Sequence, residues 1–93
     1  MDIKVKTRVT NLGWHFDVTL NEATNPSFYK VSMDKDFLTR IGADFHPEKV
    51  VKKSFEFLLD KEPKERILQE FDIVSISNYY PEFIADLSKR LMY

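Results

Sequence analysis

The sequence predicts an α+β fold, and two observations carry this prediction. Apolar and polar residues alternate through three segments of the N-terminal part, at about 2–10, 14–21 and 28–33, with the period of a half-buried β-strand. From residue 34 onward the apolar residues recur at helical spacing, and prolines divide this part of the chain into segments. We expect one domain over residues 1–93, because the length suits a single core and no long linker is present.

The three strand segments are expected to form an antiparallel meander, because consecutive strands joined by short loops usually pair. Asn11 and Gly13 lie in the first loop, and both tolerate the positive φ angles of tight turns. In the first strand, alternation directs Lys4, Lys6 and Arg8 to solvent. The residues expected on the inner face are Ile3, Val5, Thr7, Val9, Trp14, Phe16, Val18, Leu20, Tyr29, Val31 and Met33.

Helix signals follow the third strand. Asp34 can cap a short helix that stops at Gly42, and Pro47 suits the first position of a longer helix that reaches Lys61. The apolar residues of this central helix (47–61) cover about 200° of a helical wheel, which is wider than contact with one surface requires. We therefore expect the central helix to be covered on two sides.

Pro63 must end or kink the central helix, because it lacks a backbone N–H and disfavours helical angles at the preceding residue. The renewed helical period in "KERILQEF" predicts a second helix with Ile67, Leu68 and Phe71 on one face. Pro63 would then form a structural corner between two helices. The alternative, that the charged residues around Pro63 make a functional site, has less support.

Two further short helices are expected toward the C-terminus. Asp72 can cap the first, although the alternation of Val74 and Ile76 leaves a short strand at 73–77 open. Pro81 would open the second, with Ile84, Leu87 and Leu91 directed inward. Residues 34–92 are thus expected to form a set of helices separated by sharp changes of direction.

Composition bounds the function classes. Cysteine is absent, and 14 Lys and Arg residues balance 15 Asp and Glu residues at a net charge of −1. Disulfides and thiolate metal sites are therefore excluded, and a general attraction to nucleic acid is not indicated. No segment approaches the roughly 20 apolar residues of a membrane span, so we expect a soluble cytoplasmic protein.

Two groups on the outer face of the strands could carry chemistry. His15 and Asp17 point the same way beside the cations of the first strand, an arrangement that general acid–base cleavage of a phosphodiester could use. Lys4, Lys6 and Arg8 could contact a polyanion. Both groups are also typical of a solvated sheet face, where charges pair across strands and edge lysines prevent aggregation.

Other candidates have weaker chemical support. Ser54 lies in the apolar arc of the central helix, where a role as a small packing residue is a simpler interpretation than a role as a nucleophile. His46 precedes Pro47 and lies far from His15, so metal-ligand spacing is missing, and neither a metal nor a cofactor is predicted. Tyr79 and Tyr80 cannot both face the core from one helix, so one of them is a candidate for contact with a partner.

Two resemblances bear on the fold. The order of strand, short helix and longer helix over residues 28–60 resembles the ribbon-helix-helix family, dimeric DNA-binding proteins that include repressors and antitoxins. That resemblance implies a strand paired with its twin and outward Lys30 and Ser32 as base-reading residues. The block "SFEFLLDKEPKERILQEFD", with "YYPEF" after it, resembles small prokaryotic proteins of uncharacterised function, and this second resemblance implies the architecture without any activity.

We therefore expect a small non-enzymatic domain that acts through protein contacts, with another protein or with a second copy as a homodimer. A ribbon-helix-helix-like regulator or antitoxin is the alternative, although contact with nucleic acid has little support. A small nuclease or hydrolase built on His15 and Asp17 is the third hypothesis.

Overall fold

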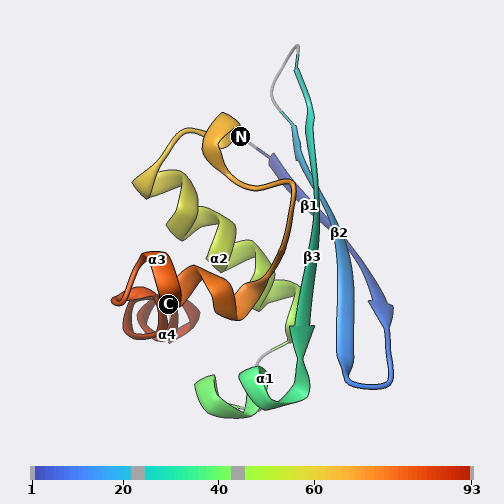
Figure 1. The fold of residues 1–93 in the computed structure, drawn as a ribbon, viewed down its shortest axis with the longest axis vertical. Coiled ribbons are helices and arrows are strands. Elements are labelled where there is room, and N and C mark those ends of the chain that lie inside the picture. The colour runs from blue at the N-terminus through green and yellow to red at the C-terminus, as the bar shows by residue number, and fades with distance from the viewer. Residues whose placement is uncertain (1, 22–24, 43–45, 93) are drawn as a thin grey trace.

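A four-stranded sheet forms one layer of the molecule in the computed structural model, which describes residues 2–21, 25–42 and 46–92. Strands β1 (Asp2–Val9), β2 (Gly13–Asn21) and β3 (Ser27–Asp34) form the predicted antiparallel meander. A short strand β4 (Glu70–Asp72) joins parallel to β3, giving the order β1-β2-β3-β4. Figure 1 shows that the helices lie on one side of this sheet and leave its other face open. The α+β class is thus confirmed, with a fourth strand that the sequence analysis missed.

The helical layer contains two longer and several short elements. Its α-helices are α1 (Lys35–Ile41), α2 (Pro47–Lys61), α3 (Ile76–Tyr79) and α4 (Phe83–Met92). Two 3-10 turns, η1 (Lys64–Arg66) and η2 (Ile73–Ser75), flank β4.

The inward residues of β2 and β3 are those that alternation predicted, and all of them except Trp14, which is half-buried, are buried. The first strand follows the pattern only as far as Thr7, since the side chain of Val9 is 78% exposed at the end of β1. The first loop contains no positive φ angle, because Gly42 is the one residue with positive φ in the described ranges. Gly13 is required for another reason: a Cβ there would lie 2.1 Å from the carbonyl oxygen of Met33.

The predicted helix boundaries after β3 are confirmed. The Asp34 carboxylate accepts a hydrogen bond from the Phe37 amide at 2.9 Å, and α1 ends at Gly42, whose φ is 114°. Pro47 is the first residue of α2, where its missing N–H leaves no helical hydrogen bond unmade.

Helix α2 is the centre of the core and is covered on two sides, as its wide apolar arc predicted. It packs against β1 and against α4, and its residues Val50, Val51, Phe55 and Phe57 are fully buried. Phe57 contacts the ring of Phe83 on α4, at 5.1 Å between centroids. Figure 1 shows α2 running between the sheet and the C-terminal helices.

The helix predicted after Pro63 is wrong, although the corner itself is present. Only the single turn η1 follows Pro63, and the chain then extends toward β4 with Ile67 buried and Leu68 58% exposed. Hydrogen bonds with β3 favour the extended backbone, because the Lys30 amide donates to the Gln69 carbonyl and the Tyr29 hydroxyl donates to the Lys64 carbonyl. Tertiary pairing thus overrides the local helical period.

The segment after β4 is helical, which confirms the main prediction for residues 73–77. Asp72 caps it, accepting a hydrogen bond from the Val74 amide at 3.0 Å. Helix α4 begins two residues after Pro81 and buries Leu87 and Leu91, whereas Ile84 is only partly buried. The alternative of a strand at 73–77 is therefore wrong, and the strand of this region, β4, ends before it at Asp72.

Candidate functional site

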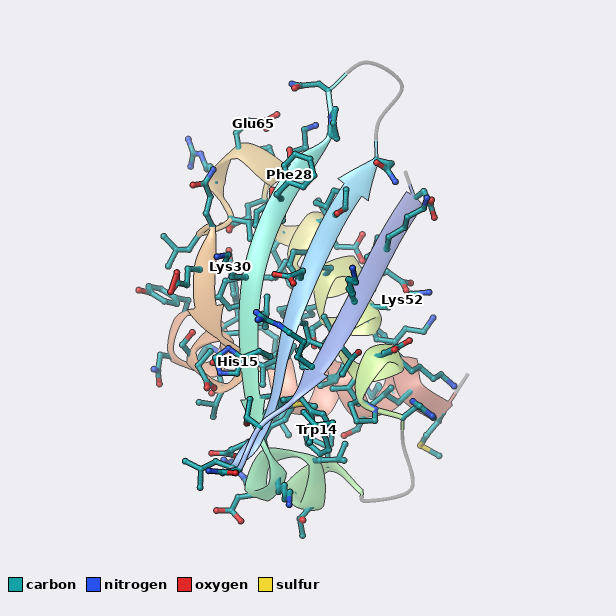
Figure 2. The ribbon with its side chains drawn as sticks, turned by 90° about the vertical axis from the view of Figure 1, so that its right-hand side faces the viewer. Trp14, His15, Phe28, Lys30, Lys52 and Glu65 are labelled. Carbon is teal, nitrogen blue, oxygen red and sulfur yellow. The ribbon has the colours of Figure 1, made fainter. Side chains whose placement is uncertain are left out.

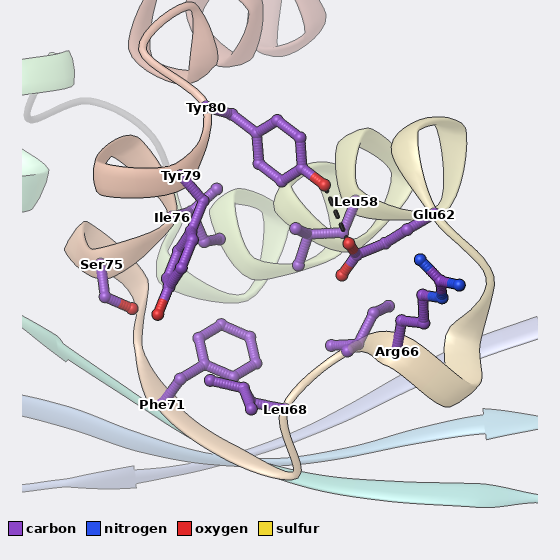
Figure 3. A pocket seen from close by; sticks show the side chains of 10 residues that line it. Leu58, Glu62, Arg66, Leu68, Phe71, Ser75, Ile76, Tyr79 and Tyr80 are labelled. Atoms are coloured by element: carbon purple, nitrogen blue, oxygen red, sulfur yellow. Dashed lines mark hydrogen bonds between the residues drawn. The ribbon is translucent and has the colours of Figure 1, made fainter.

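A groove lies at the corner after Pro63. It holds about 220 Å³ and lies between the C-terminal end of α2, the turn η1, β4 and α3. Figure 3 shows side chains from these elements converging on it. The residues that line it are Leu58, Glu62, Arg66, Ile67, Leu68, Phe71, Ser75, Ile76, Tyr79 and Tyr80.

Tyr80 forms a fixed wall of the groove. Its hydroxyl donates a hydrogen bond to the Glu62 carboxylate at 2.8 Å, the dashed line in Figure 3, and its ring packs edge-on against Phe57. The hydrogen bond to Glu62 raises the pKa of the Tyr80 phenol above its ordinary value, and desolvation and the charges of Glu62 and Glu82 add to the effect. Tyr80 therefore stays protonated and joins α2 to the segment before α4.

Tyr79 lies on the other side of the groove with 70% of its surface exposed. Leu68 across the groove and Val74 nearby are also exposed large apolar residues. The two tyrosines thus differ in burial, since Tyr80 packs on the core and Tyr79 is exposed. Sequence reasoning missed Leu68, because the helix expected after Pro63 would have directed it inward.

The polar groups of the groove differ in whether they are already engaged. Ser75 donates its hydroxyl to the Asp72 carbonyl at 2.6 Å, and Glu62 accepts from Tyr80. Arg66 is exposed at the rim and forms no ion pair with any residue in the described ranges. The groove therefore combines an apolar floor with one uncommitted cation.

The open face of the sheet carries the other predicted residues. The strand register aligns Lys6, Asp17, Lys30 and Glu70 in one row across the four strands. Figure 2 looks onto this face and shows His15, Phe28 and Lys30 along it. Opposite charges alternate along this row, which is the pattern of a solvated sheet face.

A second row aligns Arg8, His15, Ser32 and Asp72. The Ser32 hydroxyl donates to the Asp72 carboxylate at 2.8 Å, and Arg8 lies 3.9 Å from the carboxylate of Asp17. The structure therefore brings the first-strand cations beside His15 and Asp17, as the hydrolase hypothesis required. Among the described residues no hydrogen bond joins His15 to Asp17, and the Ser32 proton is directed to Asp72 rather than to the imidazole.

Ser54 and His46 lie at positions where they contribute to the structure of α2. The Ser54 hydroxyl is fully buried and donates to the Val50 carbonyl at 2.8 Å, a bond within its own helix. His46 precedes α2 as its N-cap residue without a side-chain hydrogen bond to the helix. No group of three or more His, Asp or Glu side chains within the described ranges could hold a metal ion.

The sheet topology bears on the ribbon-helix-helix resemblance. Lys30 and Ser32 do lie on the open face, but β3 is hydrogen-bonded to β2 on one edge and to β4 on the other. A two-chain ribbon requires a strand with a free edge, so β3 could pair with its twin only if a neighbouring strand left the sheet.

No family model matches the chain, and no curated protein or solved structure matches it. Within the described residues, no helix is both long and apolar enough to cross a membrane.

Proposed function

We propose that this protein is a non-enzymatic binding domain whose corner groove receives one large apolar side chain of a protein partner. The observation that carries the proposal is the groove itself, with exposed Leu68 and Tyr79 at its rim. Its 220 Å³ is smaller than the roughly 300–1,000 Å³ of sites for drug-sized ligands, so a single anchoring side chain suits it better than a cofactor. Anchors of this kind dominate the energetics of many interfaces.

Arg66 indicates that the partner carries a negative charge near its apolar side chain. A partner that placed a carboxylate beside its apolar anchor would pair with this uncommitted guanidinium, and Arg and Tyr are both enriched at interfaces. Two of the three groove hydroxyls, those of Ser75 and Tyr80, already donate to groups of this chain, which supports a binding role over a catalytic one. We place this function in the cytoplasm, since a chain without cysteine gains nothing from an oxidising compartment.

Selection from a library of random displayed peptides tests the proposal. We expect the wild-type protein to enrich peptides that carry a large apolar residue next to Asp or Glu. The double variant Leu68→Ser, Tyr79→Ser should lose this enrichment, and Arg66→Glu should shift the preference toward Lys or Arg. Leu12→Ser is the matched control, because Leu12 is 79% exposed and lies outside the groove.

Two results would contradict the proposal. Equal enrichment by the wild type and the double variant would show that the groove does not bind the peptides. A rise of mass with concentration that Leu68→Ser abolishes would show that a second copy of the chain occupies the groove, which is the homodimer expected as an alternative.

A further inference from the structure

The free edge of β1 is the second feature of the fold that is suited to binding. Strand β1 is eight residues long and pairs only with β2, and no strand lies beyond it in the part of the chain that the structure describes. Figure 2 shows β1 as the outermost strand on one side of the sheet. The opposite edge is formed by β4, which has only three residues, so β1 offers the longer row of unpaired backbone groups.

The side chains on this edge differ between the two faces. Lys4, Lys6 and Arg8 project from the open face and are exposed, whereas Ile3 and Val5 point toward the helical layer. Ile3 and Val5 are only partly buried, while Val18 and Leu20, which pair with them on β2, are at most 1% exposed. An added strand would therefore bury apolar surface on one face and meet three cations on the other.

A second copy of the chain does not fit this edge. Paired residues of an antiparallel ladder share a face, so the Lys and Arg residues of one copy would lie opposite those of the other when the helical layers of both copies are on the same side of the extended sheet. In this arrangement, every antiparallel register that pairs more than half of β1 with its twin places at least one pair of cations directly opposite. Like charges opposite each other are destabilising, and the strand is thus protected against self-pairing.

We propose that β1 binds an extended segment of another protein by strand addition, and that this segment alternates acidic and apolar residues. The backbone of β1 supplies the hydrogen bonds, as in other complexes that extend a sheet. The acidic side chains lie beside Lys4, Lys6 and Arg8, and the apolar ones lie beside Ile3 and Val5. This surface is separate from the groove, which is lined by β4 at the other edge of the sheet.

The probe is a capped peptide of alternating Glu and Val residues, flanked by Gly and Ser, and the readout is amide hydrogen exchange of β1 followed by NMR. We expect the peptide to slow exchange at alternate residues of β1, because only alternate amides of an edge strand point outward. A peptide with Lys in place of Glu should have no effect. Added salt should weaken binding, because the contributing charges are exposed.

Lys6→Gln and Lys30→Gln form a matched pair of variants. Both lysines flank Asp17 in the same row of the open face, but only Lys6 lies on the edge strand. We expect Lys6→Gln to weaken binding of the Glu–Val peptide roughly two- to fivefold, the effect of losing one cross-strand ion pair, and Lys30→Gln to leave it unchanged.

Three results would overturn this proposal. Unchanged exchange of the β1 amides at millimolar peptide would show that the edge accepts no strand. Slowed exchange that depends on protein concentration without peptide would assign the edge to a second copy. Binding of a single-stranded thymidine oligonucleotide that Lys6→Gln weakens, without slowed exchange in β1, would assign the cations to a polyanion instead.

Discussion

Replacement of Phe57 by leucine is expected to lower the free energy of unfolding by about 2 kcal/mol. The Phe57 ring is fully buried and lies 5.7 Å from the ring of Tyr80 and 5.1 Å from that of Phe83. Such aromatic pairs contribute about 0.5–1.5 kcal/mol each beyond their buried area. The charged groups of Lys61 and Arg90 lie 5.3 and 5.8 Å from the same ring, and each adds about 0.5–1 kcal/mol.

The lower ends of these ranges apply, because leucine keeps part of the apolar contact and the cations are partly solvated. A loss of about 2 kcal/mol is large against the roughly 5–14 kcal/mol expected for a chain of this length. Urea unfolding followed by circular dichroism measures the change, which should appear in the midpoint and not in the slope. Phe28→Leu is the control, because Phe28 is 65% exposed on the open face and should change stability by less than about 0.5 kcal/mol.

A Phe57→Leu variant as stable as the wild type would refute this reasoning, because it would show that the ring contacts between α2 and the C-terminal segment do not hold the core together. The same variant has a consequence for the groove. Phe57 supports the ring of Tyr80, so its loss should move the Tyr80 hydroxyl away from Glu62 and lower the pKa of Tyr80 toward the ordinary value.

Three other predictions follow from single contacts. Gly13→Ala should destabilise the fold by at least about 2 kcal/mol in thermal or urea unfolding, because a Cβ at this position would clash with the backbone of β3, which cannot move away as a side chain can. Asp72→Ala should lower the free energy of unfolding by about 1–2 kcal/mol, since Asp72 both caps η2 and accepts a hydrogen bond from the Ser32 hydroxyl. It should also speed amide exchange where β3 pairs with β4. Unchanged exchange would contradict the role given to this carboxylate. Glu62→Gln should lower the pKa of Tyr80, as measured by phenolate absorbance. In the wild type the pKa of Tyr80 is higher in the folded than in the unfolded state. The stability contributed by Tyr80 is therefore present below its ordinary pKa of 10 and is lost as pH rises through the raised value.

The sequence was sufficient to predict the meander and the boundaries of α1 and α2, because the signals for these elements are local. Alternation over eight or nine residues specifies which face of a strand is buried, and a single capping carboxylate at Asp34 fixes the start of α1. Val9 shows the limit of such reasoning. It continues the alternation, but β1 ends there, beyond the part of the sheet that the helices cover.

Strand β4 could not be predicted from the local pattern. Three residues are too few to show alternation, and the residues before them fit a helical period equally well. The pairing that decides the matter is distant in sequence, since Ser32 and Asp72 are 40 residues apart. The candidate groove was hidden for the same reason: the contrast between Tyr79 and Tyr80 could be inferred from one helix, but exposed Leu68 depends on the extended path after Pro63.

The corner at Pro63 connects the architecture to the proposed binding. A helix continued through "KERILQEF" would have buried Leu68 and left the edge of β3 unpaired, whereas the extended path closes this edge with β4 and leaves Leu68 at the rim of a groove. The same few residues therefore replace the long edge of β3 by the three-residue edge of β4 and line the groove proposed to bind a partner, while the edge of β1 stays open. Because the two surfaces lie at opposite edges of the sheet, Leu68→Ser should leave binding of the Glu–Val peptide unchanged, and Lys6→Gln should leave the peptides selected by the groove unchanged. An effect of either variant on both kinds of peptide would contradict the separation of the two surfaces.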